Sequence, residues 1–153
     1  MRCLLAVVGK PRNAALAAAI REYEERAARY WPLEVHEVKE EPARGASAAV
    51  IMRKEGERLG AQVGSARMIA CEAGGTSFTS EAFATWLQKE REGGRDIAFV
   101  IGGAFGLAPE LSKRAARRLS LAPWTLPHEL ARLVLAEQLY RAGSIVRGEP
   151  YHK

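Results

Sequence analysis

The sequence predicts an α/β fold in which a mostly parallel sheet is covered by helices on both faces. Short runs that are apolar throughout, such as CLLAVVG (3–9) and RMIAC (67–71), are typical of strands buried on both faces. Longer stretches rich in Ala, Glu and Arg lie between these runs and are typical of helices. Alternation of strand and helix along a chain favours a parallel sheet.

The expected elements follow one another from the first residues to the last. The strands are expected over residues 3–9, 33–38, 67–71, 96–101 and 119–122. The helices are expected over residues 13–31, 46–62, 80–92, 109–118 and 127–142. Pro32 and the pair Gly93 and Gly94 end helices, whereas Pro109 and Pro127 suit the first turn of one. Because no repeat, low-complexity tract or linker interrupts this order, we expect one domain over residues 1–153.

The composition is ordinary for a soluble globular protein, with 48% hydrophobic and 27% charged residues. No apolar run approaches the roughly 20 residues of a membrane span, so we expect no membrane association. Cys3 and Cys71 lie in separate apolar runs without the Cys or His spacing of a zinc site. We therefore expect reduced cysteines, no metal and a cytoplasmic protein.

Positive charge is concentrated at the C-terminus. The net charge is +5, and residues 1–112 hold 15 Lys and Arg against 15 Asp and Glu, whereas residues 113–153 hold 8 against 3. Such an excess favours a surface that binds anions or nucleic acid. The run KRAARR (113–118) is equally typical of a solvated helix face, so both interpretations stay open.

The last helix predicts a second subunit. Residues 130–139 (LARLVLAEQL) are apolar around most of the helix, with only Arg132, Glu137 and Gln138 interrupting. A helix of this kind needs cover on more than one side, and a partner copy can supply it. We therefore expect a homodimer.

The segment VIGGAFGLAP (100–109) matches no phosphate-binding fingerprint. Ala104 and Leu107 stand where the dinucleotide motif needs glycines, and no Gly-Lys-Ser/Thr follows as in a P-loop. Residues 103–106 fit the G-x-x-G of KH domains, but that loop joins two helices, whereas this one follows a strand. The remaining interpretation is a tight turn at the end of a strand. Its glycines either serve packing or allow the backbone to approach a ligand closely.

The C-terminal segment carries a resemblance to a known family. LSLAPWTLPHELARLVLAEQLYRAGSIVRGEPYHK (119–153), together with FVIGGAFGL (99–107), resembles the bacterial RlmH family. The elements T-L-P-H, E-Q-x-Y-R-A and the terminal Y-H-K are specific in combination, and the chain length and order of elements agree throughout. Members of this family are 23S rRNA pseudouridine-N3 methyltransferases of the SPOUT superfamily.

The resemblance implies a fold and a reaction. The C-terminal third would form a trefoil knot, which is rare among proteins. S-adenosylmethionine, the methyl donor, would bind in the knot, and a homodimer would place two such pockets near its interface. The substrate would be a pseudouridine of 23S rRNA in the assembled ribosome, with no role for DNA.

The resemblance also assigns the contacts to the methyl donor, mostly through backbone groups. They fall on Cys71, Gly102, Gly103, Leu121, Ala122, Pro123, Trp124, Thr125 and Leu126. The chain departs from the family at Glu72 and Thr76, where Asp and Lys are usual, and at the pair Pro123 and Trp124. The roles of Glu72 and Thr76 therefore stay open.

Methyl transfer from a sulfonium needs aligned reactants and the removal of one proton from the base. The family pattern assigns positioning of the base to Tyr151 and His152, with His152 as a candidate proton acceptor. Arg132 and Arg141 would hold phosphate or base oxygen atoms. Both also stand four residues from a helical partner, His128 and Glu137, so ordinary pairing within the helix stays an alternative.

Two other functions are compatible with the sequence. One is a non-catalytic module that binds RNA or the ribosome through the basic C-terminal residues. The other is a SPOUT methyltransferase with a different RNA target. His36, alone in an early strand, is interpreted as a packing residue.

Overall fold

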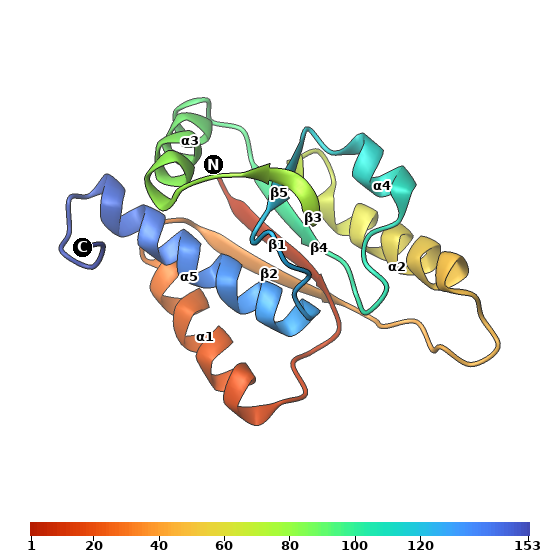
Figure 1. Ribbon diagram of the computed structural model, residues 1–153. Helices are drawn as coiled ribbons and strands as arrows, with labels where there is room; N and C mark the ends of the chain where they lie inside the picture. The colour runs from red at the N-terminus through yellow and green to blue at the C-terminus, as the bar shows by residue number, and fades with distance from the viewer.

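The computed structural model describes all residues, 1–153, and contains one parallel sheet of five strands in the order β2-β1-β4-β3-β5 (Figure 1). The strands are β1 (Cys3–Val8), β2 (Leu33–Val38), β3 (Arg67–Ser77), β4 (Ile97–Ile101) and β5 (Arg117–Ser120). The helices are α1 (Ala14–Ala28), α2 (Ala48–Val63), α3 (Ser80–Glu92), α4 (Pro109–Arg114) and α5 (His128–Val146). The predicted α/β class with a parallel sheet is confirmed.

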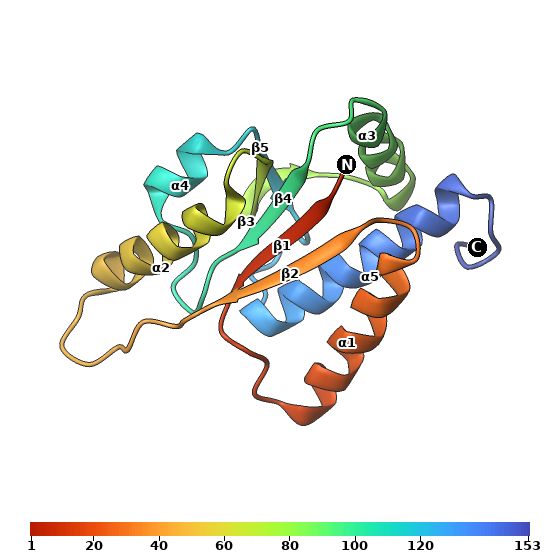
Figure 2. The same cartoon turned by 180° about the vertical axis from the view of Figure 1, so that it is seen from behind.

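The two faces of the sheet carry separate cores. Alternate residues of β1, such as Leu5 and Val7, pack with Leu135 and Leu139 of α5 and with residues of α1 and α3. The other residues of β1 face α2 and α4. Figures 1 and 2 show α1, α3 and α5 on one face and α2 and α4 on the other. Burial on both faces explains why the central strands are apolar at every position.

Helix α5 is anchored to the first helix and the turn after it. Trp31, fully buried, donates a hydrogen bond from Nε1 to the carbonyl oxygen of Leu139, 2.8 Å away. A Cβ atom at Gly143 would lie 2.5 Å from Cβ of Tyr30, so only glycine allows this approach of the chain. The last helix therefore lies over the sheet with its central turns buried.

The predicted ends of β3 and α4 are wrong. Strand β3 continues to Ser77 instead of ending at the expected Cys71, because its second half also pairs with β5, after a register shift between Cys71 and Thr76. Gly75 permits this crossing, since a Cβ there would lie 2.6 Å from the carbonyl carbon of Leu119. Helix α4 stops at Arg114 instead of residue 118, because Arg117 already pairs with Ile69 of β3.

The last two elements also shift. Strand β5 covers residues 117–120 instead of 119–122, and α5 runs four residues beyond the expected Ala142. Arg117 tolerates a strand position because its guanidinium lies over the rings of Phe78 and Trp86, 5.2 and 5.5 Å from their centroids. No helix is long and apolar enough to cross a membrane. Threading of the chain through a knot stays a prediction.

Candidate functional site

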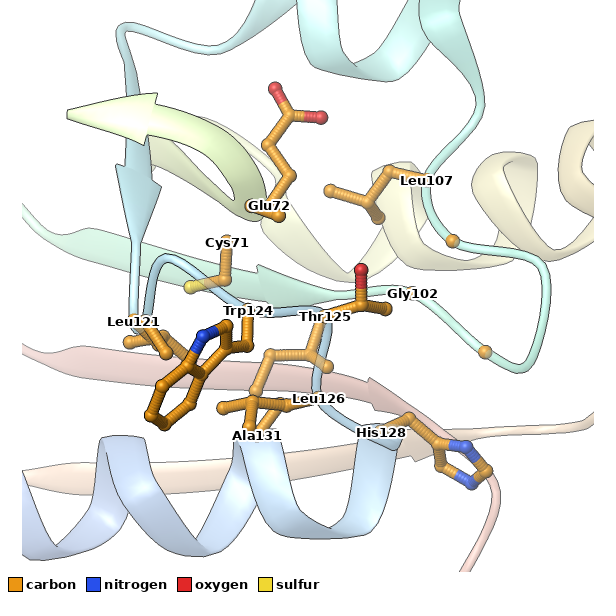
Figure 3. Close-up of a pocket in the computed structure, with 15 residues that line it drawn as sticks. Cys71, Glu72, Gly102, Leu107, Leu121, Trp124, Thr125, Leu126, His128 and Ala131 are labelled. Carbon is orange, nitrogen blue, oxygen red and sulfur yellow. The ribbon is translucent and has the colours of Figure 1, made fainter. Parts of the chain in front are cut away.

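A pocket opens at the carboxyl ends of β3 and β4, between these strands and the loop that leads from β5 to α5 (Figure 3). Its cavity volume is about 160 Å³, which is below the roughly 300–1,000 Å³ of pockets that enclose a whole ligand, so a bound molecule would stay partly exposed to solvent. Ligands of open parallel sheets bind at this edge. The lining residues are Cys71, Glu72, Ala73, Ile101, Gly102, Gly103, Gly106, Leu107, Leu121, Ala122, Trp124, Thr125, Leu126, His128 and Ala131.

One wall of the pocket is a tight turn over residues 102–106. The N–H of Gly106 donates to the carbonyl oxygen of Gly103 at 3.0 Å, and Gly106 has a φ of 86°, which favours glycine. A Cβ atom at Gly102 would lie 2.6 Å from the carbonyl oxygen of Gly106 and 2.7 Å from the nitrogen of Leu107. The two sides of the turn therefore touch through backbone atoms, and this contact sets the shape of the wall.

A buried carboxyl group supports this turn from below. Glu55 of α2 is 2% exposed, and its Oε2 accepts the N–H of Glu41 at 3.1 Å. A Cβ atom at Gly103 would lie 2.8 Å from Oε1 of Glu55, which has no hydrogen-bond partner. Burial raises the pKa of this carboxyl group above its ordinary value.

The opposite wall is the loop between β5 and α5, whose backbone donors are unused. None of the N–H groups of Ala122, Trp124, Thr125 and Leu126 donates a hydrogen bond within the protein. The side chain of Trp124 is largely exposed, at 77%. An apolar pocket bordered by free peptide N–H groups can hold a flat heterocycle, and these N–H groups can donate hydrogen bonds to its nitrogen and oxygen atoms.

The floor of the pocket lies in the middle of β3, where its pairing with β4 ends, and holds Cys71 and Glu72. Burial raises the pKa of the Cys71 thiol to about 12, so this sulfur stays protonated and contributes shape rather than a nucleophile. Glu72 accepts a hydrogen bond from Oγ of Ser112 at 2.6 Å and pairs with Arg118. These two partners hold the Glu72 carboxylate at the pocket wall. They are the contacts that the longer side chain makes where the family usually has Asp.

The structure brings together eight of the nine residues assigned to the methyl donor: all but Pro123 line the pocket. The other residues that line the pocket, among them Ala73, Ile101, Gly106, Leu107 and His128, were not predicted from the sequence. For Ile101 and Ala73 a signal was present, because both stand at or beyond the carboxyl end of an expected strand. His128 showed no such signal, since its position depends on how α5 is placed.

Arg132 lies near the pocket but is held by carboxylates. Its side chain is 8% exposed, its Nε donates to Oε1 of Glu24 at 2.6 Å, and its Nη1 lies 3.4 Å from Oε2 of Glu37. It lines a narrow hollow next to the pocket together with His128 and Gly102. The predicted contact of Arg132 with RNA would require it to leave both partners.

Arg141, Tyr151 and His152 contact one another near the C-terminal end of α5, and Figure 1 shows the C-terminus of the chain beside this end of the helix. The hydroxyl of Tyr151 donates to Oε1 of Glu137 at 3.0 Å, and the Arg141 guanidinium lies 4.8 Å from the centre of its ring. His152 contacts Arg141 at 3.2 Å through Nδ1 and Glu81 at 2.8 Å through Nε2.

The environment of this cluster is polar and partly closed. Burial, a hydrogen bond with Tyr23 and the hydrogen bond that Tyr151 donates to Glu137 raise the pKa of Tyr151, and the hydrogen bond that Arg141 donates to Glu137 raises that of Arg141. None of the three predicted residues lines the pocket. No group of three or more His, Cys, Asp and Glu side chains is placed to hold a metal ion.

A parallel sheet with a ligand pocket at the carboxyl ends of its strands, walled by a glycine turn and by a loop with free backbone donors, defines the class of α/β ligand-binding domains. The model of the family described as "Predicted SPOUT methyltransferase" matches residues 1–152. Ribosomal RNA large subunit methyltransferase H of Gemmatimonas aurantiaca is 62% identical over the whole of both chains, and that of an Anaeromyxobacter species is 47% identical over the same share. The chain belongs to the SPOUT methyltransferases and, within them, to the family of ribosomal RNA large subunit methyltransferase H.

Solved structures agree with this fold. The chain resembles the tRNA (m1G37) methyltransferase from Aquifex aeolicus with a TM-score of 0.57 and 15% identity, covering 100% of this chain and 75% of that one. A probable methylase family protein from Haemophilus influenzae gives a TM-score of 0.58 and 13% identity, covering 99% and 70%. At such identities the likeness concerns the fold alone.

Proposed function

We propose that this methyltransferase acts on ribosomal RNA and transfers a methyl group from S-adenosylmethionine to N3 of a pseudouridine in 23S rRNA of the assembled ribosome. The full-length identity to proteins named ribosomal RNA large subunit methyltransferase H supports the substrate class. The motifs T-L-P-H, E-Q-x-Y-R-A and Y-H-K support the particular base and atom. We further propose one domain over residues 1–153 and a cytoplasmic location, where assembled ribosomes occur.

The pocket carries this proposal, because its groups suit the methyl donor. The free N–H groups of Ala122, Trp124, Thr125 and Leu126 would hold the polar edge of adenine and the ribose, and Leu107 and Leu121 would contact the ring. The backbone at Gly102 and Gly103 permits close approach. When bound, S-adenosylmethionine supplies an electrophilic methyl group on a positively charged sulfur.

The remaining work of the protein is alignment of the base and removal of the N3 proton. His152 is the proposed proton acceptor, and Tyr151 the proposed contact to the base. About ten residues of α5 separate Ala131 at the pocket from Arg141 at the tail, which is roughly 15 Å at 1.5 Å per residue. Within one subunit the tail therefore has to leave Glu137 and Glu81, or it serves the pocket of a partner subunit in a homodimer.

Arg141 is the better placed of the two proposed arginines for contact with RNA. Its side chain is 25% exposed, against 8% for Arg132, and it lies beside Tyr151 and His152. Arg132 is bound by Glu24 and Glu37, so its proposed contact needs a rearrangement of α1 and β2.

The activity is tested with purified protein, radiolabelled S-adenosylmethionine and ribosomes from a strain that lacks the corresponding gene. Incorporation of label into 23S rRNA at one pseudouridine, located by mass spectrometry, is the expected result. Label in another RNA would replace the target but keep the enzyme class. Absence of both labelling and calorimetric binding of S-adenosylmethionine would overturn the proposal in favour of a non-catalytic RNA-binding module.

The tail is tested by removing residues 151–153. We expect loss of methylation with unchanged binding of S-adenosylmethionine, because the tail does not line the pocket. His152→Gln, in turn, is expected to slow methylation near neutral pH, and the difference from the wild-type protein is expected to shrink at high pH, where the base loses its N3 proton to solvent without help from the protein. Full activity of the truncated protein would exclude Tyr151 and His152 from the reaction.

A further inference from the structure

The edge of the sheet opposite the methyl-donor pocket carries an open hollow lined by three arginines, Arg67, Arg95 and Arg114. Arg67 begins β3, Arg95 lies two residues before β4, and Arg114 ends α4. In a parallel sheet the amino ends of all strands meet at one edge, and Figures 1 and 2 show the connections into β3 and β5 close together there. The three side chains thus come from separate parts of the chain.

Backbone hydrogen bonds fix the three segments relative to one another. The N–H of Arg67 donates to the carbonyl oxygen of Asp96 at 2.8 Å, and the N–H of Ala116 donates to that of Met68 at 2.9 Å. Arg114 also lies against α2, where its Nη1 would be 3.7 Å from a Cβ atom at Gly60. The guanidinium groups are therefore carried by an ordered scaffold rather than by a free loop.

The hollow contains positive charge without matching negative charge. No Asp or Glu lines it, and the exposed side chains of Arg95 and Arg114 form no ion pair. Arg67 contacts Glu90 at 3.3 Å through Nη1, but its Nε is buried and has no hydrogen-bond partner. Elsewhere in the molecule, Arg2 and Arg132 each face two carboxylates, and Arg58 is held by the carboxylate of Glu41 and the carbonyl oxygen of Lys39.

The buried Nε donor of Arg67 without a partner and the two unpaired guanidinium groups of Arg95 and Arg114 indicate an anionic ligand. Guanidinium groups suit phosphate in particular, because their planar fork of donors matches two phosphate oxygens. The hollow is open to solvent and is separated from the pocket by the length of β4. It therefore suits one phosphate group of an extended polymer better than an enclosed small molecule.

We propose that Arg67, Arg95 and Arg114 form a docking site for a backbone phosphate of the substrate RNA, distinct from the methyl-donor pocket. The inference rests on the proposed function, which supplies RNA as the substrate. A phosphate contact of this kind fixes the orientation of the RNA without reading its sequence. Ribosomal RNA would then contact the protein at two places, the methyl-donor pocket and the three arginines at the amino ends of the strands.

The experiment compares the double variant Arg95→Ala/Arg114→Ala with the matched control Arg21→Ala/Arg44→Ala. Arg21 and Arg44 are also exposed and form no ion pair, so both variants lose two positive charges. Binding to ribosomes is measured between about 50 and 200 mM salt, together with methylation rate and calorimetric binding of S-adenosylmethionine. Arg95→Gln/Arg114→Gln keeps polar side chains in case the alanine variant unfolds.

We expect the Arg95/Arg114 variants to bind ribosomes at least tenfold more weakly at about 100 mM salt, with a shallower salt dependence, since each phosphate contact contributes about 0.9 to its slope. Binding of S-adenosylmethionine stays unchanged, and saturating ribosome concentrations restore the methylation rate. Equal ribosome affinity of the Arg95/Arg114 and control variants would overturn the docking site. Failure of the wild-type protein to methylate rRNA would instead overturn the proposed function, so the two failures are distinguishable.

Discussion

Replacement of Gly102 by alanine tests whether the glycine turn shapes the methyl-donor pocket. The added Cβ would lie 2.6 Å from the carbonyl oxygen of Gly106, whereas ordinary contacts of a Cβ begin at about 3.4 Å, so this backbone has to move by about 0.8 Å. Since the obstacle is backbone, rotation of a side chain cannot relieve it. Overpacking of this kind costs about 1–3 kcal/mol.

The displaced atoms belong to Gly106 and Leu107, which themselves line the pocket. We therefore expect Gly102→Ala to weaken binding of S-adenosylmethionine at least tenfold, equivalent to about 1.4 kcal/mol. The free energy of unfolding, measured with urea, should fall by about 1–3 kcal/mol. Isothermal titration calorimetry on the folded variant measures the affinity.

Two further glycines provide a graded control. At Gly60, inside α2, a Cβ meets nothing closer than 3.5 Å, so alanine should leave binding unchanged and stabilise the helix by up to about 1 kcal/mol. At Gly103 the obstacle is the carboxyl group of Glu55, at 2.8 Å, which is a side chain, so the effect should be intermediate. Binding of S-adenosylmethionine by Gly102→Ala with the wild-type affinity would refute the assignment of the turn as a wall of the pocket.

The remaining predictions concern buried contacts. The raised pKa of Glu55 means that the folded state binds this proton more tightly than the unfolded state, so its contribution favours folding below the ordinary pKa and is lost as pH rises through the folded pKa. Glu55→Gln should therefore lessen the fall in stability above about pH 5, measured by urea unfolding across pH, and an unchanged pH profile would contradict this. Arg132→Ala should destabilise the fold by about 3–5 kcal/mol because it leaves Glu24 without its buried partner; wild-type stability combined with lost ribosome binding would instead indicate a direct contact with RNA. Gly143→Ala should lower stability by about 1–3 kcal/mol, because its Cβ would lie 2.6 Å from Cδ2 of Tyr30, and an unchanged thermal midpoint would show that the two helices can separate.

The central strands of the sheet were predictable because a strand buried on both faces is apolar at every position, and this pattern is visible in the sequence. The strands at 3–8 and 97–101 are apolar at every position, and Thr79 and Gly93 bound α3 in the way that helix caps do. The structure of residues 113–120 was harder to predict. Their arginines and alanines favour a helix, but residues 117–120 form a strand because they pair with β3. Pairing of Arg117 with Ile69 is a tertiary effect that no local pattern reports.

Some residues of the candidate site could likewise be predicted from the sequence and others could not. The end of the strand before Gly102 is visible in the sequence, so the glycine turn could be placed at one edge of the sheet, whereas Cys71 and residues 121–126 were placed beside it by the resemblance to the family. The ion pairs of Arg132 join α5 to Glu24 and Glu37, more than 90 residues away, and helical spacing gave no sign of them. The position of Tyr151 and His152 far from the pocket likewise depends on the length and direction of α5.

The central position of β4 has a consequence for the order in which the protein can form during its synthesis. Strand β4 lies between β1 and β3, so Cys3 and Ile97 become neighbours only after about two thirds of the chain exists. The loop at 121–127 and α5, which close the pocket, are translated last, and α1 has to wait for α5 to cover it. Pairing of such distant segments slows folding. A nascent chain that stops short of α5 therefore lacks one wall of the pocket, so binding of a methyl donor has to wait until residues 121–131 are made.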